Sequence, residues 1–356
     1  MTSPFSEQRR YDVDWMRTLA LMLLIAYHSV ISFQPWAAEL VYFIENKDTL
    51  EWLWIPMEII NIWRIPLLFF ISGMGVRFAL QRRTVVKLLA DRTWRILFPA
   101  VVGLFLICPI SLLLFQIANH LEPKWIPNPG HLWFLYNIFI YVILLLPLIA
   151  LFKKYPQNLL VRSMRKLTEK PWTLFFLALP FTLEAHWLQP QYFSLFVYTL
   201  HGFLIGFLCF FTGFLLASVG ENFWRAVQSI RFITLFTALG LYAVRLFYFE
   251  LQNTNNALNG LECILWIFAV IGFSAKHLNR DSTLLQRLSP AVYPIYILHL
   301  PIQQAIASVL FACPIGAHVK LLLLLLGTYM TCWLLYKFLQ RVPVLRPIFG
   351  MKYANH

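Results

Sequence analysis

Apolar residues along this chain form long continuous runs that are separated by short polar segments. The first run extends from about Arg17 to Phe33, and the others centre on residues 56–80, 94–118, 131–152, 171–189, 193–217, 231–250, 257–276, 290–312 and 319–338. A helix of about 20 apolar residues matches the thickness of a bilayer core. A membrane β-barrel would instead show short segments of alternating polarity. The pattern therefore predicts an all-α polytopic membrane protein with about ten transmembrane helices.

The polar segments between the runs are too short to hold a separate soluble domain. We therefore predict one transmembrane domain over residues 1–356, with short polar tails at 1–16 and 340–356. No small-residue cleavage site follows the first run, so we expect a retained span and not a signal peptide. The sequence also shows no internal repeat of the kind that many transporters carry.

Composition supports a membrane protein. Hydrophobic residues make up 60% of the 356 positions and charged residues 13%, whereas soluble chains are roughly half apolar and about a quarter charged. The net charge of +13 would suit a nucleic-acid partner only if the basic residues shared one water-facing surface. Instead, 24 of the 29 Lys and Arg residues lie on the side of the predicted spans that holds both termini. The positive-inside rule places that side in the cytoplasm, and no nucleic-acid partner is expected.

The cysteines and common motifs exclude several kinds of site. No CxxC or His-x-x-x-His pair supports a metal site, and no Gly-rich phosphate loop supports a nucleotide site, so neither is expected. Small buried thiols usually serve as packing residues. We assign that role to the five cysteines, which lie in or at the ends of predicted spans: Cys108, Cys209, Cys263, Cys313 and Cys332.

The first span carries an arginine and a histidine on one face. Charged and imidazole groups inside apolar spans are costly, so they usually face a cavity or a partner. Arg17 and His28 are eleven residues apart, close to three helical turns, and so project from one face roughly 16 Å apart along the axis. Alternatively, Arg17 reaches the membrane interface and His28 is a packed, hydrogen-bonded histidine.

Two arginines stand at the predicted cytoplasmic mouth of the third span. Arg92 and Arg95 are three residues apart, which places them on one face of an α-helix. Paired guanidinium groups in that position are suited to bind phosphates from the cytosol. The alternative is that both are ordinary positive-inside residues.

Arg64 lies several residues inside the second span from its outer end, where cytoplasmic charge bias does not explain it. Two explanations remain open. Arg64 either pairs with a buried acid, such as Glu58 or a carboxylate of another span, or it faces an anionic substrate.

Histidines also occur in two later spans. His131 begins the fourth span on the outer side, and His299 lies about 15 Å into the ninth. Tyr293 and Tyr296 share a helical face with His299. An aromatic belt for His131 and a helix-to-helix hydrogen bond for His299 are the simpler explanations. Together, however, the polar residues of these spans predict a polar chamber.

Six segments that carry these residues occur in a fixed order along the chain. They are RRYDVDWMRTLALMLLIAYHSVISF, WRIPLLFFISGM, DRTWRILFP, HLWFL, IYILHLPI and RVPVLRPIFG. This set resembles the acyltransferase-3 family of integral membrane acyltransferases, and within it a branch of glucan succinyltransferases. The family's opening helix has an Arg, ten residues and then the catalytic His, here Arg17 and His28. Thr18 stands where the family often has Gly, and Leu300 where the glucan branch has a second His, so the acceptor stays open.

The resemblance implies an O-acyltransferase of the bacterial inner membrane. Its donor would be cytoplasmic acyl-CoA, either succinyl-CoA or acetyl-CoA, and its acceptor a hydroxyl of an extracytoplasmic glucan or other glycan. His28 would act either as a general base or as a transient acyl carrier. The expected site residues are His28 and Arg17 for catalysis, Arg64, His131, Tyr296 and His299 for substrate binding, and Arg92 and Arg95 for the CoA phosphates.

Two other functions are alternatives to acyl transfer. In an ion-coupled transporter the intramembrane Arg and His residues would form a substrate site and a proton relay, but related halves with matching broken helices are not evident. A structural scaffold in the bilayer leaves His28, Arg64 and His299 unexplained. A homo-oligomer is compatible with all of these functions.

Overall fold

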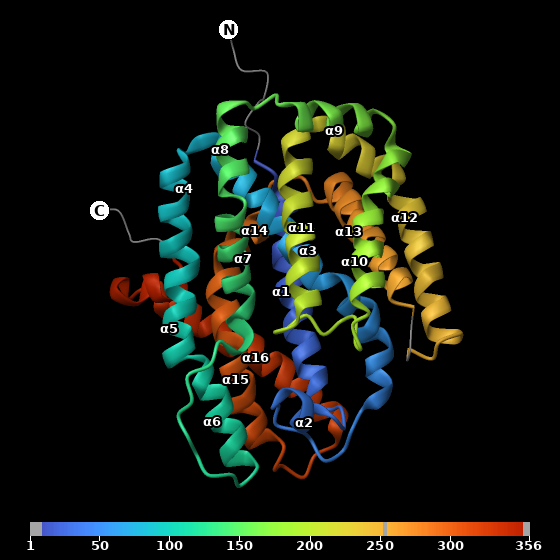
Figure 1. Cartoon of the computed structure of the whole chain (residues 1–356). Helices are drawn as coiled ribbons and strands as arrows, with labels where there is room; N and C mark the ends of the chain where they lie inside the picture. The colour runs from blue at the N-terminus through green and yellow to red at the C-terminus, as the bar shows by residue number, and fades with distance from the viewer. Residues whose placement is uncertain (1–8, 252–254, 352–356) are drawn as a thin grey trace.

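The computed structural model describes residues 9–251 and 255–351 (Figure 1). All the regular secondary structure among these residues is helical, and they contain no strand. The outer parts of the two predicted polar tails lie outside the described residues. The α-helices are α1 Tyr11–Ile31, α2 Ala37–Val41, α3 Trp54–Arg82, α4 Val85–Arg92, α5 Phe98–Leu106, α6 Cys108–Ala118, α7 Trp133–Leu144, α8 Leu146–Lys154, α9 Leu159–Glu169, α10 Leu179–Leu188, α11 Leu200–Val219, α12 Glu221–Phe247, α13 Asn256–His277, α14 Thr283–Leu288, α15 Val292–Leu310 and α16 Ala317–Leu339. The shorter elements are the 3-10 helices η1 Glu51–Leu53, η3 Gly130–Leu132, η4 Pro171–Ala178, η5 Ser289–Ala291 and η6 Pro343–Phe349, and the π-helix η2 Thr93–Leu97.

Several helical segments are long and apolar enough to cross a membrane. Within the described ranges six are continuous, and the pair α7 and α8, bent by 54°, gives a seventh if it is one span. The continuous segments are Glu51–Arg82, Val85–Ala118, Leu200–Val219, Glu221–Phe247, Asn256–His277 and Ala317–Leu339. All of these overlap runs predicted from the sequence. The prediction of an all-α, multi-pass membrane protein is therefore confirmed.

The three other predicted spans are helical but fall outside that set. Polar side chains lower the mean hydropathy of two of them: Asp14, Arg17 and His28 in α1, and His299, Gln303 and Gln304 in α15. The run 171–189 divides into η4 and the ten-residue α10. The count of ten spans and the cytoplasmic position of both termini stay predictions.

Glycines bring α3 and α11 into close contact along their length. A Cβ at Gly73 would lie 1.9 Å from the carbonyl oxygen of Phe210, and a Cβ at Gly213 would lie 2.0 Å from that of Phe70. Small residues allow such an approach of two membrane helices, and dispersion contacts between the backbones then stabilise the pair. This packing fixes α3, which carries Arg64.

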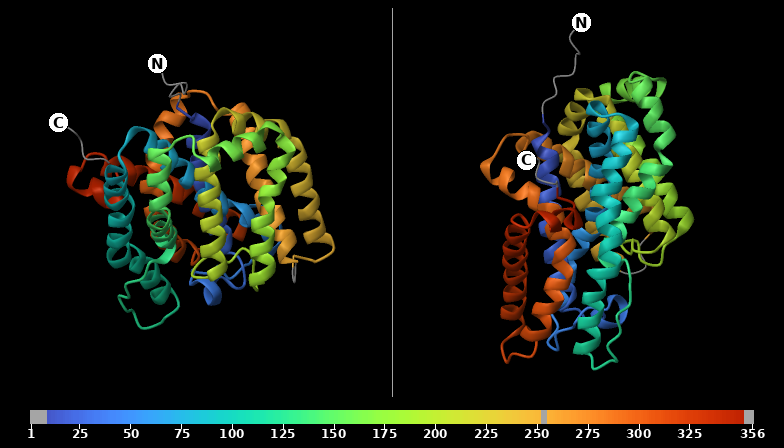
Figure 2. Two further views of the ribbon diagram at one scale, coloured as in Figure 1. Left: turned by 45° about the horizontal axis from the view of Figure 1, so that its top comes forward. Right: turned by 90° about the vertical axis from the view of Figure 1, so that its left-hand side faces the viewer.

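The two ends of the bundle differ in charge. Figures 1 and 2 show α9 and the start of α4 at the end where α1 begins, and α2 at the opposite end. The first end holds the basic residues of α9, and the loop after α2 at the other end holds Glu45 and Asp48. The positive-inside rule predicts that the α9 end faces the cytoplasm.

Cysteine labelling tests this orientation. Lys166 in α9 and Asp48 are exposed at opposite ends, whereas four of the native cysteines are buried and Cys313 is only partly exposed. In a Cys313→Ser background, Lys166→Cys should react with an impermeant maleimide only from the cytoplasm, and Asp48→Cys only from outside. Labelling of Lys166→Cys from outside would reverse the orientation.

Candidate active site

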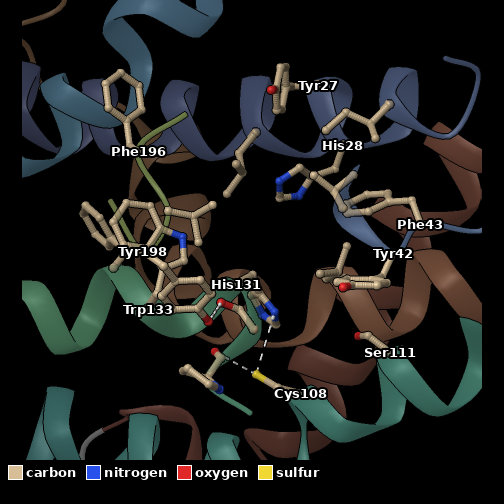
Figure 3. Close-up of a pocket in the computed structure, with 18 of the residues that line it drawn as sticks. Tyr27, His28, Tyr42, Phe43, Cys108, Ser111, His131, Trp133, Phe196 and Tyr198 are labelled. Atoms are coloured by element: carbon tan, nitrogen blue, oxygen red, sulfur yellow. Dashed lines mark hydrogen bonds between the residues drawn. The ribbon is translucent and has the colours of Figure 1, made fainter. Parts of the chain in front are cut away.

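A cavity of about 810 Å³ lies among α1, α3, α6, α15 and the loops near α2 (Figure 3). Most of its wall surface is apolar and aromatic, and polar side chains interrupt this surface at several positions. Such a cavity is of the size that binds a small ligand. The polar and ionisable side chains that line it are Tyr27, His28, Tyr42, Asn61, Arg64, Cys108, Ser111, Gln116, Asn128, His131, Ser194, Tyr198, Tyr296 and Gln304.

Part of this wall was predicted to be membrane helix. The run 193–217 begins as helix only at Leu200, and residues 194–198 instead form a non-helical wall of the cavity. Two local features determine that α11 begins at Leu200. The Thr199 hydroxyl accepts a hydrogen bond from the Gly202 amide as an N-cap. A Cβ at Gly202 would lie 1.8 Å from the Phe196 carbonyl oxygen, so only glycine lets the segment fold back.

Three histidines from distant parts of the sequence meet beside the cavity. Nδ1 of His28 lies 3.0 Å from Nε2 of His299, and the two ring planes differ by 6°. The ring of His131 stands edge-on to His299, with centroids 5.0 Å apart. His28 and His131 line the cavity, whereas His299 is fully buried behind them. The structure therefore brings together three of the predicted site residues, whose roles stay predictions.

Pro301 explains how His131 is held. Proline has no backbone N–H, so Pro301 cannot donate the usual helical hydrogen bond to the carbonyl of Ile297. Nε2–H of His131 donates to this carbonyl at 3.0 Å instead. In the neutral ring, Nδ1 then has a free lone pair. Cys108 Sγ lies 3.9 Å from that nitrogen (Figure 3).

Arg64 is a fully buried cation in the cavity wall. Its guanidinium lies 3.9 Å from the centre of the Tyr27 ring, and none of its nitrogens has a hydrogen-bond partner among the described residues. Pairing with Glu58, one of the predicted alternatives, does not occur. Glu58 binds Arg245 at 2.6 Å, and Glu262 binds the same arginine at 3.0 Å. The acid near Arg64 in sequence is thus already neutralised by another cation.

Arg17 lies outside the cavity, in a second polar cluster toward the α9 end. Its Nη2 lies 3.4 Å from the Ile71 carbonyl, and its Nη1 lies 3.6 Å from Asp14. Arg92 donates to the Gly75 carbonyl at 3.3 Å, one helical turn further along α3. Arg17 and His28 share the single helix α1, as predicted, but at separate sites.

Arg92 and Arg95 do not lie in one regular α-helix, which the prediction of a shared face assumed. Arg92 ends α4, and residues 93–97 form the π-helix η2, whose wider turn changes the angle between the two side chains. Arg92 is half-buried and Arg95 is exposed. Both nevertheless remain close enough to Arg17 to repel it electrostatically.

Tyr293 completes the second cluster and was not singled out as a site residue. Its hydroxyl is buried and has no hydrogen-bond partner in the described part of the chain, and Arg92 and Arg95 act on it electrostatically. The sequence does contain a signal for this residue, because Tyr293 is in helical register with Tyr296 and His299. We call Arg17, Arg92, Arg95 and Tyr293 the arginine cluster.

Comparison with known proteins identifies the family of this chain. A family model described as an acyltransferase domain matches residues 10–337. No curated protein matches the chain. The matched region contains both the histidines and the arginine cluster, and it gives no support to the transporter alternative. Within residues 9–251 and 255–351 no group of His, Cys, Asp or Glu side chains is arranged to hold a metal ion. The chain belongs to the acyltransferase-3 family and is a membrane acyltransferase.

Proposed function

We propose that this protein, in the bacterial inner membrane, transfers an acyl group from cytoplasmic acyl-CoA to a hydroxyl of an extracytoplasmic glycan, with His28 as general base. The observation that carries the proposal is the position of His28. Its ring lines the cavity and is also held from behind by His299. A general base needs both access to the reacting hydroxyl and a fixed orientation.

The donor would enter from the arginine cluster. Three guanidinium groups and the unpartnered hydroxyl of Tyr293 suit the phosphates of CoA, which accept charge-assisted hydrogen bonds. Arg17 and His28 are separated by about 16 Å along α1. A pantetheine arm is long and flexible enough to bring the thioester from this cluster toward His28.

The acceptor would occupy the outer part of the cavity. Tyr42, Trp133 and Tyr198 contribute aromatic side chains, and Gln116 and Asn128 contribute amides. A sugar has apolar ring faces and a rim of hydroxyl groups, and this wall offers partners for both. A glucan is the acceptor that we favour.

The chemistry is a direct transfer. The acceptor oxygen attacks the thioester carbonyl carbon while Nε2 of His28 takes the hydroxyl proton. The carbon–sulfur bond then breaks, an ester forms, and the proton passes to the CoA thiolate. Free CoA and the acylated glycan are the products, and His28 returns to its neutral state.

Product release tests this function. The purified protein, given succinyl-CoA or acetyl-CoA and a soluble glucan, should release free CoA and acylate the glucan in equal amounts. Reconstituted protein that moves glucan or ions without releasing CoA would overturn the proposal. Incubation with labelled acyl-CoA alone distinguishes the two roles of His28, because only an acyl carrier would become labelled.

Donor binding gives a second test. Arg92→Ala and Tyr293→Phe should each raise the KM for acyl-CoA several-fold and leave the acceptor KM little changed. Tyr293→Phe is the sharper variant, because the hydroxyl it removes has no partner in the described protein and its loss should not destabilise the fold. Lys166→Ala is the control, because Lys166 is an exposed basic residue of α9 that lies outside the arginine cluster. Equal effects on both substrates would contradict a donor site.

A further inference from the structure

The hydrogen bonds behind His28 determine which of its nitrogens carries a proton. Nδ1 of His299 lies 2.6 Å from the Tyr296 carbonyl oxygen, which can only accept, so this nitrogen carries the hydrogen. A neutral imidazole has one N–H, which leaves Nε2 of His299 as an acceptor. Its partner at 3.0 Å is Nδ1 of His28, which must therefore donate. Nε2 of His28 then holds a free lone pair.

The geometry of the two rings favours this bond. Their centroids are 5.2 Å apart and their planes differ by only 6°, so the 3.0 Å contact lies close to both ring planes. The N–H of one ring therefore points along the lone pair of the other, which is the favourable alignment. Neither ring has a carboxylate partner among the residues that the structure describes.

We propose that His299, held by the Tyr296 carbonyl, is a positioning residue that keeps His28 in its Nδ1–H tautomer, with Nε2 directed to the acceptor hydroxyl. This inference rests on the proposed function. During transfer, Nε2 of His28 gains the hydroxyl proton and the ring becomes an imidazolium. Its Nδ1–H still donates to Nε2 of His299, so a neutral histidine occupies the place that an aspartate takes in a serine-protease triad.

Two substitutions of equal size separate positioning from packing. The side-chain oxygen of Gln can accept a hydrogen bond from Nδ1 of His28, whereas Leu cannot. His299→Leu should lower kcat by roughly 10- to 100-fold with little change in KM, and His299→Gln should recover most of that loss. The exposed His318→Leu, which should leave kcat unchanged, is the control. Equal losses in the Leu and Gln variants, in parallel with thermal stability, would overturn the proposal.

Nitrogen-15 NMR of histidine-labelled protein gives a readout that does not depend on activity. The signals of His28 are identified by their absence in His28→Ala. Nδ1 of His28 should be protonated in the wild type and in His299→Gln, and the two tautomers should mix in His299→Leu. A wild-type His28 protonated at Nε2 would overturn the inference. The NMR result and the activity can also disagree. If the NMR result is as expected but the protein transfers no acyl group, the proposed function is wrong and the tautomer assignment still holds.

Discussion

Replacement of His28 by alanine should reduce acyl transfer by ~100-fold or more, the usual scale for loss of a general base. The substitution removes the ring that lines the cavity and leaves Nε2 of His299 without its donor. An unpaired buried acceptor costs about 1–3 kcal/mol, so the fold should persist. Turnover in detergent, with thermal unfolding measured beside it, checks both statements. Retention of a tenth of normal activity would contradict the assignment.

His28→Asn is the matched variant for this test. Its amide can still donate to Nε2 of His299, so the buried acceptor stays satisfied, but it cannot take a proton at neutral pH. If His28 is a general base, the protein should therefore lose as much activity in His28→Asn as in His28→Ala. The loss of stability should be smaller in His28→Asn. If Asn restored activity, the role of His28 would be structural.

The helices, and the helix on which several candidate site residues lie, could be predicted because both depend on local sequence. Continuous apolar runs predicted most of the helices, and the first of these runs predicted that Arg17 and His28 lie in one helix, α1. The bond between His28 and His299 joins residues 271 positions apart. No periodicity within one helix reports how two helices are rotated against each other, so this contact could not be predicted.

Two differences between the expectations and the structure have local causes in the sequence. Glu58 and Arg64 are six residues apart, which places them about 120° apart around a helix and not at the neighbouring i+3 or i+4 positions. Thr199 and Gly202 are the cap and the close-contact residue that delay the start of α11. The π-helix after Arg92 also has a local feature beside it: Pro99 has no N–H to donate to the Arg95 carbonyl, so the regular α-helical hydrogen bond cannot form there.

The largest effect on donor choice is expected at Arg64. A succinyl group carries a carboxylate into the membrane, where an unpaired anion is costly, and Arg64 is a buried cation without an acidic partner in the described chain. Arg64→Gln should therefore reduce succinyl transfer by ~100-fold or more and acetyl transfer only slightly, since acetyl has no carboxylate to pair. Arg64→Lys should keep part of the succinyl activity. Rates with succinyl-CoA and acetyl-CoA, measured on the same preparation, give the comparison.

Arg245→Gln is the control that separates ligand pairing from structure. Arg245 is also a buried arginine, but it binds Glu58 and Glu262, so its loss leaves two acids uncompensated and should cost about 3–5 kcal/mol of stability. Both donors should then lose activity equally, together with the fold. If Arg64→Gln behaves in the same way, Arg64 is structural and the succinyl donor is excluded. A loss confined to succinyl-CoA follows only if the carboxylate of the acyl group pairs with Arg64, because the stacking on Tyr27 is the same for either donor.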